Sequence, residues 1–331
     1  MSHVNLFSFL LYWVRSLAAT LQMANPNPPL RLYGVYAIVA FPIQLVLYGC
    51  VRVLAAIQTP LTVQARTRYG AELICHLPDA IQTCIFLYGV WEPDISAFIA
   101  SELQPRDTFV DVGAHVGYHV ILASRTVGSE GKVIAIEASP ETFTLLKQNL
   151  ALNPECSNVR AFNVAASEQS GMIPLYLGPK GVEGWSTIVK RESFKDSCTV
   201  SSAPLAELLT EPELRSARLI KIDVEGAEVE VLQGLVPVIG SLRPDLELII
   251  EITPSLWPTA NQEQKLTCEQ VLSPLFEAGF RPYQIRNNYA PWRFLYPERI
   301  SRPLQIREPI QVSRFTGQVE LVLSRKDVEQ L

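Results

Sequence analysis

Residues 108–137 read TFVDVGAHVGYHVILASRTVGSEGKVIAIE, and this stretch decides the fold. Two short apolar runs, residues 108–112 and 132–137, enclose a segment at 118–127 that has the composition of a helix. A strand, a helix and a second apolar strand in this order predict a parallel pair of strands, because a parallel connection needs a crossover of this length. The crossover is expected to be right-handed.

The same alternation continues along the chain. It predicts further strands and helices at residues 140–152 (helix), 159–163 (strand), 219–223 (strand), 225–235 (helix) and 246–252 (strand). Apolar strands that alternate with amphipathic helices indicate a parallel sheet covered on both faces. The sequence therefore predicts an α/β fold with a doubly wound, mostly parallel sheet.

Two regions depart from this rhythm. Residues 172–202 are rich in Gly, Ser, Thr and Trp, which indicates a hairpin or a loop. The tail predicts a helix near 269–276 and strands near 281–285 and 319–324. These two strands are expected to form an edge hairpin in which one member is antiparallel.

The composition excludes several classes of protein. The chain has 331 residues, 18% of them charged, and a net charge of −5. Nucleic-acid-binding domains usually have a basic surface, so no nucleic-acid partner is expected. The six cysteines contain no CxxC pair, and so predict neither a zinc site nor a disulfide framework. His115 and His119 are four positions apart, with a glycine among the residues between them and no carboxylate in the helical metalloprotease position, so no metal site is predicted.

The amino-terminal region is strongly apolar. Twenty uncharged residues, 32–51, lie between Arg31 and Arg52, a length that can span the hydrocarbon layer of a membrane. The alternative is a pair of hydrophobic helices packed on the rest of the protein, which Pro42 and Gln44 favour. We therefore predict a hydrophobic region with a possible anchor, a cap and a main domain, at residues 1–60, 61–105 and 106–331.

Ligands of a doubly wound sheet lie outside the carboxyl ends of its strands. Asp111, Gly113 and Gly117 belong to the first such loop. Gly113 allows the chain to turn sharply off the strand, and Gly117 permits a close backbone approach where the helix starts. A dinucleotide site would prefer GxGxxG, whereas this loop is GxxxG, so pyrophosphate is disfavoured. As an ordinary strand–helix turn, the loop would need no ligand.

The second candidate is Glu137, which ends the second strand 24 residues after Gly113. An acid at this position can bind the two ribose hydroxyls of an adenosine cofactor. The alternative is a solvated carboxylate at a strand end. The spacing from the glycine loop favours the ribose contact.

The third candidate is IKIDVEGAE at residues 220–228, where three carboxylates meet a lysine. Acidic residues at a helix amino terminus also cap free amides, which can account for Glu225 and Glu228. Capping accounts less well for Asp223, because its strand directs it toward the crevice.

Together, these motifs resemble the FkbM-type methyltransferases, a branch of the class I S-adenosylmethionine-dependent enzymes. Further matching pieces are YGVWEP at 88–93, GSEGKVIAIEA at 128–138 and NLALN at 149–153. The resemblance covers roughly residues 61–240 and continues more weakly to about residue 324. It implies a seven-stranded Rossmann-like sheet with a reversed last strand, and methyl transfer from S-adenosylmethionine to a hydroxyl oxygen.

Two positions depart from the family pattern. His115 stands where the family often has Asn, which can alter the hydrogen bonds of the loop. Ala206 stands where an Asp is usual. That Asp resembles a helix-start residue, so its replacement is expected to affect stability more than chemistry.

The resemblance and the strand-end positions together predict the site residues. The residues expected to bind S-adenosylmethionine are Asp111, Gly113, Ala114, His115, Gly117, Glu137, Ala138, Asn163 and Asp223. An alcohol is a poor nucleophile at neutral pH, so a carboxylate or a histidine should accept its proton. The catalytic candidates, in order of preference, are Asp223, Glu225, Glu92 and His119. The segment 184–186 is expected to be either a lid or an ordinary surface hairpin.

A small-molecule or lipid-linked hydroxyl acceptor is expected; sugars, glycolipids and other secondary metabolites all fit. S-adenosylmethionine is a cytosolic metabolite, so the protein is expected at the cytoplasmic face of a membrane, or in the cytoplasm without an anchor. Two other classes stay open. One is a nucleotide-dependent oxidoreductase on a similar sheet, and the other is a membrane-anchored scaffold protein without catalysis.

Overall fold

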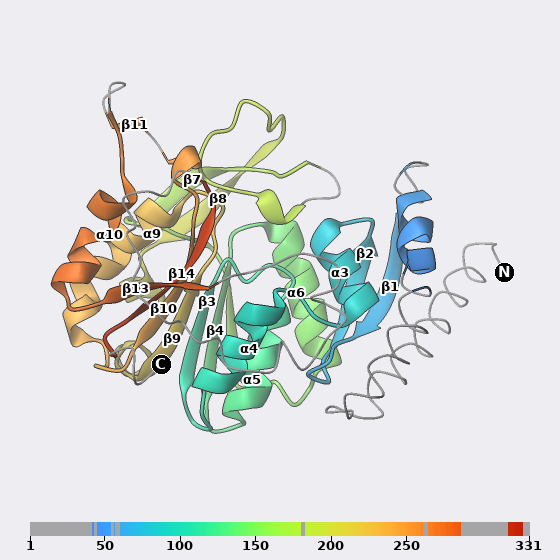
Figure 1. The fold of residues 1–331 in the computed structure, drawn as a ribbon, viewed down its shortest axis with the longest axis horizontal. Coiled ribbons are helices and arrows are strands. Elements are labelled where there is room, and N and C mark those ends of the chain that lie inside the picture. Colours follow the sequence, from blue (N-terminus) through green and yellow to red (C-terminus); the bar gives the residue numbers. More distant parts are fainter. Residues whose placement is uncertain are drawn as a thin grey trace. The chain divides into compact units, whose positions relative to one another are not determined.

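The computed structural model describes residues 42, 45–53, 56, 60–179, 183–257, 259–260, 264–285 and 317–326 (Figure 1). The chain divides into two compact units. The first comprises residues 1–97, 180–182 and 287–303, and the second comprises residues 98–179, 183–286 and 304–331. The domain boundaries predicted at 60/61 and 105/106 stay predictions.

In the first unit, β1 (Leu61–Arg66) and β2 (Glu72–Leu77) form an antiparallel hairpin. Helix α3 (Ala80–Tyr88) follows; Asp79 caps it by accepting a hydrogen bond from the Gln82 amide at 2.8 Å. Helix α4 (Pro93–Glu102) begins in this unit and ends in the second.

The predicted apolar span, residues 32–51, lies mostly outside the described residues. Its end belongs to a helical segment at 45–53. Among the residues that the structure describes, no helix is long and apolar enough to cross a membrane.

The second unit contains a seven-stranded sheet in the order β13-β14-β10-β9-β3-β4-β5. The strands are β3 (Thr108–Val112), β4 (Lys132–Glu137), β5 (Val159–Asn163), β9 (Ala217–Ile222), β10 (Glu247–Ile252), β13 (Arg281–Ile285) and β14 (Val319–Ser324). Strands β3, β4, β5, β9 and β10 are parallel, whereas β14 is antiparallel to both β10 and β13. The predicted sheet with its reversed last strand is confirmed.

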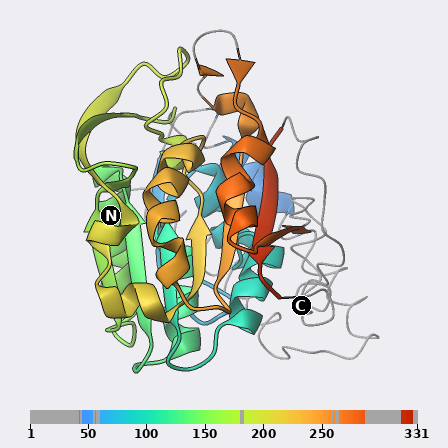
Figure 2. The ribbon, with the colours of Figure 1, turned by 90° about the vertical axis from the view of Figure 1, so that its left-hand side faces the viewer.

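Helices cover both faces of this sheet. Figure 1 shows α5 (Tyr118–Val127) and α6 (Pro140–Leu152) on one side, and α9 (Glu228–Leu235) and α10 (Cys268–Glu277) on the other. Figure 2 shows α9 and α10 side by side over the strands. The face beneath them contributes Val110, Ile134, Ile220, Leu248 and Leu321 to one buried apolar cluster. Alternate residues of these five strands point to this cluster, as the pleat requires.

The region at 172–202 forms the predicted hairpin. Strands β7 (Gly171–Tyr176) and β8 (Ser197–Ala203) pair antiparallel, and the short β6 (Ala165–Ala166) pairs with β8. The remaining short elements are η1 (Glu183–Trp185), α7 (Leu205–Leu208), α8 (Glu211–Ser216), η2 (Val236–Ser241), η3 (Pro254–Leu256), β11 (Thr259–Ala260) and β12 (Gln264–Lys265).

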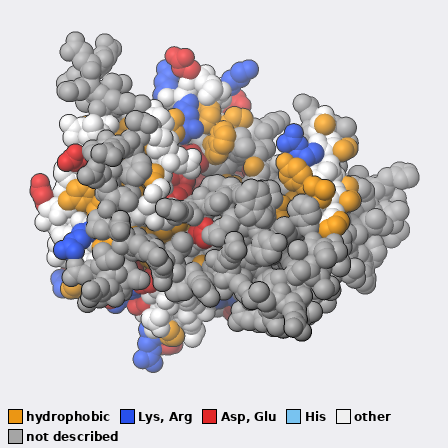
Figure 3. All heavy atoms as spheres, viewed as in Figure 1, with side chains coloured by type: hydrophobic (Ala, Val, Ile, Leu, Met, Phe, Trp, Pro, Cys, Tyr) orange, Lys and Arg blue, Asp and Glu red, His pale blue; other side chains and the backbone are white. Residues whose placement is uncertain are grey.

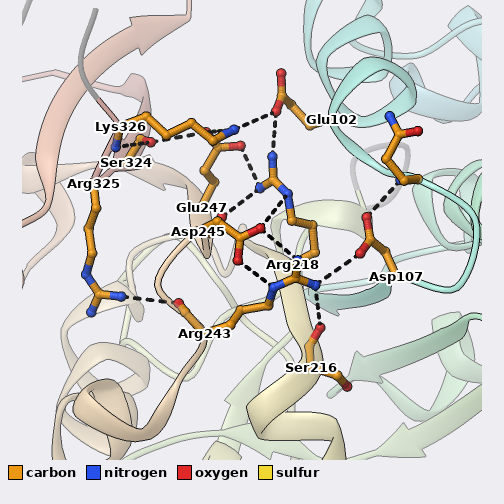
Figure 4. Close-up of polar contacts among 11 residues, drawn as sticks. Glu102, Asp107, Ser216, Arg218, Arg243, Asp245, Glu247, Ser324, Arg325 and Lys326 are labelled. Atoms are coloured by element: carbon orange, nitrogen blue, oxygen red, sulfur yellow. Dashed lines mark hydrogen bonds and ion pairs between the residues drawn. The ribbon is translucent and has the colours of Figure 1, made fainter. Parts of the chain in front are cut away.

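A network of charged side chains connects the amino-terminal ends of the parallel strands (Figure 4). Arg218 of β9 donates to Glu247 of β10 at 2.8 Å and to Glu102 at 2.6 Å. Lys326, just past β14, lies 3.2 Å from Glu102 and 3.3 Å from Glu247. The Arg218 side chain is 7% exposed and that of Glu247 is fully buried, so each charge depends on the others for compensation.

Removal of the Arg218 charge is expected to destabilise the second unit strongly. Arg218→Met leaves the buried Glu247 carboxylate with less compensation, which typically costs about 3–5 kcal/mol of unfolding free energy. Urea unfolding measures this loss. Arg215→Met is the matched control, because Arg215 pairs with Glu211 in an exposed ion pair; its loss should stay below about 1 kcal/mol. Equal losses in the two variants would contradict the network's role.

Candidate functional site

The loop that follows β3 lies between the ends of β4 and β9. The amides of Gly113 and Ala114 donate to the Ile136 carbonyl at 2.9 and 3.0 Å, and the Asp223 amide donates to the Val112 carbonyl at 2.9 Å. Gly113 has φ +84°, and a Cβ atom there would lie 1.8 Å from the Asp223 carbonyl oxygen. Only glycine fits this position.

The loop reaches α5 through two further left-handed residues. His115 has φ 49°, and Gly117, the residue before α5, has φ 87°. A Cβ atom at Gly117 would lie 3.3 Å from the Leu146 side chain of α6, so the backbone packs closely against α6 here. Asp111, at the end of β3, is buried.

Glu137 binds this loop to β4. One of its carboxylate oxygens accepts the His115 amide and the other accepts the Ser139 amide, each at 2.8 Å. Burial raises the pKa of Glu137 to about 7, and the nearby Asp223 adds to this, although the two amide bonds lower it. The ribose contact predicted for Glu137 stays a prediction. The hydrogen bond by which Glu137 holds the loop could not be predicted from local sequence, because His115 lies 22 residues away from Glu137.

Asparagine side chains fix the neighbouring backbone. Asn163 donates to the carbonyls of Glu137 and Ala138, at 2.9 and 3.0 Å. Buried Asn149 donates to the Val116 carbonyl at 2.8 Å, inside the loop after β3. The NLALN motif supported only the family resemblance in the sequence, whereas in the structure it supports the shape of the loop.

Asp223 lies where β9 ends, and Lys221 donates to its carboxylate at 2.6 Å. Lys221 pairs in register with Asp111 of β3, so both side chains project from the same face of the sheet. His119 of α5 is buried, and both burial and the Lys221 charge hold its pKa well below the ordinary histidine value. His119 is therefore neutral at physiological pH.

The chain then makes a tight turn before α9. Glu225 has φ 56° and Gly226 has φ 103°, neither of which a helix allows. The helix predicted to start at Glu225 is therefore wrong at its beginning; α9 starts at Glu228. A Cβ atom at Gly226 would lie 2.9 Å from Cβ of Leu256, so this position also requires glycine.

The two glutamates of this turn are differently placed. Glu228 is fully buried and accepts the Gly226 amide and the Trp257 indole N–H, each at 2.6 Å. Its role is to hold the turn. The Glu225 side chain is 22% exposed, and burial, followed by the Asp223 charge, raises its pKa to about 8.

Two acidic residues at this edge were missed by the sequence analysis. Glu251 of β10 and Glu320 of β14 are buried opposite each other in the antiparallel register. A carboxylate oxygen of Glu251 lies within 4.8 Å of one of Asp223. Burial, then Asp223 and Glu320, hold the pKa of Glu251 well above its ordinary value. The sequence feature that could have identified Glu251 is a glutamate within the otherwise apolar run at 248–252.

The remaining catalytic candidate, Glu92, belongs to the first unit. It is buried, lies just before α4 and has φ 41°. Its catalytic role stays a prediction, as do the roles of Asp223, Glu225 and His119. Trp185, in the segment predicted to be either a lid or an ordinary surface hairpin, is exposed in η1.

The groups at the carboxyl ends of β3, β4 and β9 fit S-adenosylmethionine. Glu137 is a strand-end carboxylate of the kind that binds a ribose diol. Asp223 places a carboxylate next to the loop, which suits a cofactor that carries a sulfonium and an ammonium group.

Comparison with known proteins is consistent with this geometry. A family model described as the methyltransferase FkbM domain matches residues 111–282. The hexuronic acid methyltransferase AglP of Haloferax volcanii is 28% identical over 218 residues, which cover 66% of this chain and 84% of AglP. Methyltransferase sdnD of Sordaria araneosa is 28% identical over 223 residues, which cover 59% of this chain and 81% of sdnD.

Solved structures are more distant. The methyltransferase FkbM of Methylobacillus flagellatus KT is 13% identical, with a TM-score of 0.39, and the match covers 67% of this chain and 44% of that chain. A SAM-dependent O-methyltransferase of Thermotoga maritima is 18% identical, with a TM-score of 0.39, and the match covers 80% of this chain and 78% of that chain.

The raised pKa values at this site predict a pH-dependent stability. Glu137 and Glu228 have pKa values of about 7 and Glu225 of about 8, against 4.5 in an unfolded chain. The folded state therefore binds these protons more tightly. The stability they contribute is fully present below pH 4.5 and is lost as the pH rises through about 7 to 8.

Glu228→Gln tests this dependence. The variant cannot ionise, so its unfolding free energy should decline less between pH ~5 and pH ~8 than that of the wild type. Urea unfolding at the two pH values measures the decline. Glu211→Gln, at an exposed position on α8, should leave the decline unchanged. An identical decline in Glu228→Gln and the wild type would refute the linkage.

Proposed function

The chain belongs to the methyltransferase FkbM domain family, and from this membership we propose that it methylates a hydroxyl oxygen of its acceptor with S-adenosylmethionine as the methyl donor. When bound, the cofactor supplies a methyl group on a positively charged sulfur. The observation that carries the proposal is the junction of Gly113, Glu137 and Asp223, which brings the ends of three strands together. Family membership disfavours both the oxidoreductase and the scaffold protein.

The protein's own task is positioning and proton transfer. Methyl transfer needs the acceptor oxygen, the methyl carbon and the sulfur in line, so correct placement supplies much of the rate. Asp223 is the proposed base, since it directly follows β9 at the carboxyl ends of the parallel strands and Lys221 holds its carboxylate by a 2.6 Å ion pair. Neutral His119, Glu225 and Glu92 are the second choices.

The acidic side chains of the site favour a hydroxyl-rich acceptor. Asp223, Glu225, Glu251 and Glu320 supply carboxyl oxygens that can accept hydrogen bonds from hydroxyl groups. AglP is described as acting on a hexuronic acid, which supports a carbohydrate acceptor. We propose a hydroxyl of a sugar, a glycolipid or another secondary metabolite.

Membrane association is proposed on the helical segment 45–53. Leu47 and Val51 are buried on one side, whereas Leu45, Val46 and Val53 are 59–64% exposed. Hydrophobic side chains gather on the surface of the first unit in Figure 3. An apolar surface of this kind can bind a lipid interface. S-adenosylmethionine is cytosolic, so the proposed location is the cytoplasmic face of a membrane.

Cofactor binding should depend on Glu137. Glu137→Ala removes the proposed ribose contact and the support of the loop, and should weaken binding by about 1.5–3 kcal/mol, roughly tenfold to a hundredfold. Isothermal titration with S-adenosylmethionine measures the affinity, and circular dichroism checks the fold. Glu141→Ala, at an exposed position on α6, is the control. Unchanged affinity in a folded Glu137→Ala protein would reject this placement of the ribose.

Turnover should depend on Asp223. Asp223→Asn keeps the shape but removes the base, so kcat should fall by about 10²–10⁴-fold while cofactor affinity changes little. Transfer of labelled methyl groups to a panel of neutral sugars and hexuronic acids measures turnover. A lowered Tm with near-normal turnover would instead identify a capping residue. Weakened cofactor binding with turnover recovered at saturation would identify a cofactor contact.

Membrane association is tested by fractionation. The full-length protein should sediment with membranes and resist carbonate extraction, because apolar contacts do not depend on charge. A chain that begins at Pro60 should remain in the supernatant. Full-length protein that stays soluble without detergent would favour helices packed on the protein.

A further inference from the structure

Arg191 reaches the site from the connection between β7 and β8. Its Nη2 donates to the Glu225 carbonyl at 2.6 Å and lies 3.8 Å from the Glu225 carboxylate. The guanidinium lies over the Phe194 ring, with its carbon 5.1 Å from the ring centre. The Arg191 side chain is 14% exposed. A residue far from the strand ends in sequence therefore contacts the turn that carries two catalytic candidates.

The turn that Arg191 contacts is conformationally costly. Glu225 is a non-glycine residue with φ 56°, a left-handed conformation that persists only where the surroundings hold it. Glu228 holds one side of the turn by accepting the Gly226 amide. Arg191 holds the Glu225 carbonyl, and so fixes the peptide that leads into Gly226.

The titratable groups around Glu225 are mostly acidic. Asp223, Glu228 and Glu251 face it with carboxyl groups, while Arg191 and Lys221 are the cations. The Lys221 ammonium is already bound to Asp223. Arg191 is therefore the cation that contacts Glu225 directly among the described residues, and it opposes the rise in the pKa of Glu225 that burial and Asp223 cause.

The hydrogen bonding of the Arg191 side chain is incomplete. Its Nε is buried and has no hydrogen bond to any residue that the structure describes. A buried donor without a partner lowers the stability of the folded protein. An arginine with a purely stabilising role would therefore be expected to have its Nε hydrogen-bonded. Residues that break such a local rule tend to occur at functional sites.

We propose that Arg191 is a positioning residue of the methyl-transfer site, where it holds the turn through the Glu225 carbonyl and stabilises the ionised form of the Glu225 carboxyl group. The proposal rests on the proposed function for the identity of the site. If Arg191 has this role, the β7–β8 connection is part of the active centre. Arg191 then influences the ionisation of Glu225, which lies next to Asp223.

The test follows the titration of Glu225 itself, which requires no acceptor. Isotope-edited infrared spectra of the ¹³C-glutamate-labelled full chain give its midpoint, and Glu225→Gln identifies the signal. Arg191→Met should raise the midpoint by about one pH unit or more, since a neighbouring opposite charge typically shifts a carboxyl group by about 1–3 units. Arg191→Lys should restore most of the wild-type midpoint. Lys190→Met, at an exposed neighbouring position, should leave it unchanged.

These variants separate control of charge from a purely structural role. A folded Arg191→Met protein with an unshifted Glu225 midpoint would overturn the proposal, even if the protein were less stable. Failure of Arg191→Lys to restore the midpoint would also overturn it. Thermal unfolding and circular dichroism establish which variants are folded.

Titration with S-adenosylmethionine separates this proposal from the proposed function. The wild type should bind it, and Arg191→Met should move the pH dependence of the affinity in the same direction as the Glu225 midpoint. A wild type that binds no S-adenosylmethionine at any pH would reject the proposed function, while the infrared titration would still decide the role of Arg191. Binding with an unchanged pH dependence in Arg191→Met would reject the role of Arg191 at this site.

Discussion

The backbone of Gly113 passes so close to the Asp223 carbonyl that no side chain fits between the loops after β3 and β9. This contact joins two central strands at their carboxyl ends, where a parallel sheet leaves a crevice. Glu137 joins the third strand to the same loop through the His115 amide. The relative positions of the proposed cofactor and base residues depend on these two contacts.

Buried charges are compensated differently at the two ends of the parallel strands. At the amino-terminal ends, Arg218 and Lys326 compensate Glu102 and Glu247 through several short contacts (Figure 4). At the carboxyl edge, the carboxylates outnumber the nearby cations, and the pKa values of Glu137, Glu225 and Glu251 are all raised. Perturbed pKa values concentrate at functional sites, so the second edge is where binding and chemistry are expected.

The turn between β9 and α9 shows how stability and reactivity are connected. The Glu228 carboxyl group accepts two hydrogen bonds inside the protein. Glu225 adopts a left-handed conformation, and its side chain is partly exposed. One short motif therefore contains a residue that maintains the turn, Glu228, and another that stays partly exposed, Glu225. Arg191 contacts this turn, so the connection between β7 and β8 also contributes to its conformation.

Much of the fold could be predicted from local sequence, because the apolar periodicity and glycine positions that define strands and helices are local properties. The bounds of β3, α5 and β4 agree with the prediction, and Gly113, Glu137 and Asp223 were found from their places after strands. The start of α9 was wrong, since an acid-rich helix start and a left-handed turn look alike in sequence. The approach of Arg191, the pairing of Glu251 with Glu320 and the clamp from Glu137 to His115 arose only from tertiary structure. Each joins residues far apart in the chain, and strand order and register, which no local pattern specifies, decide which of them meet.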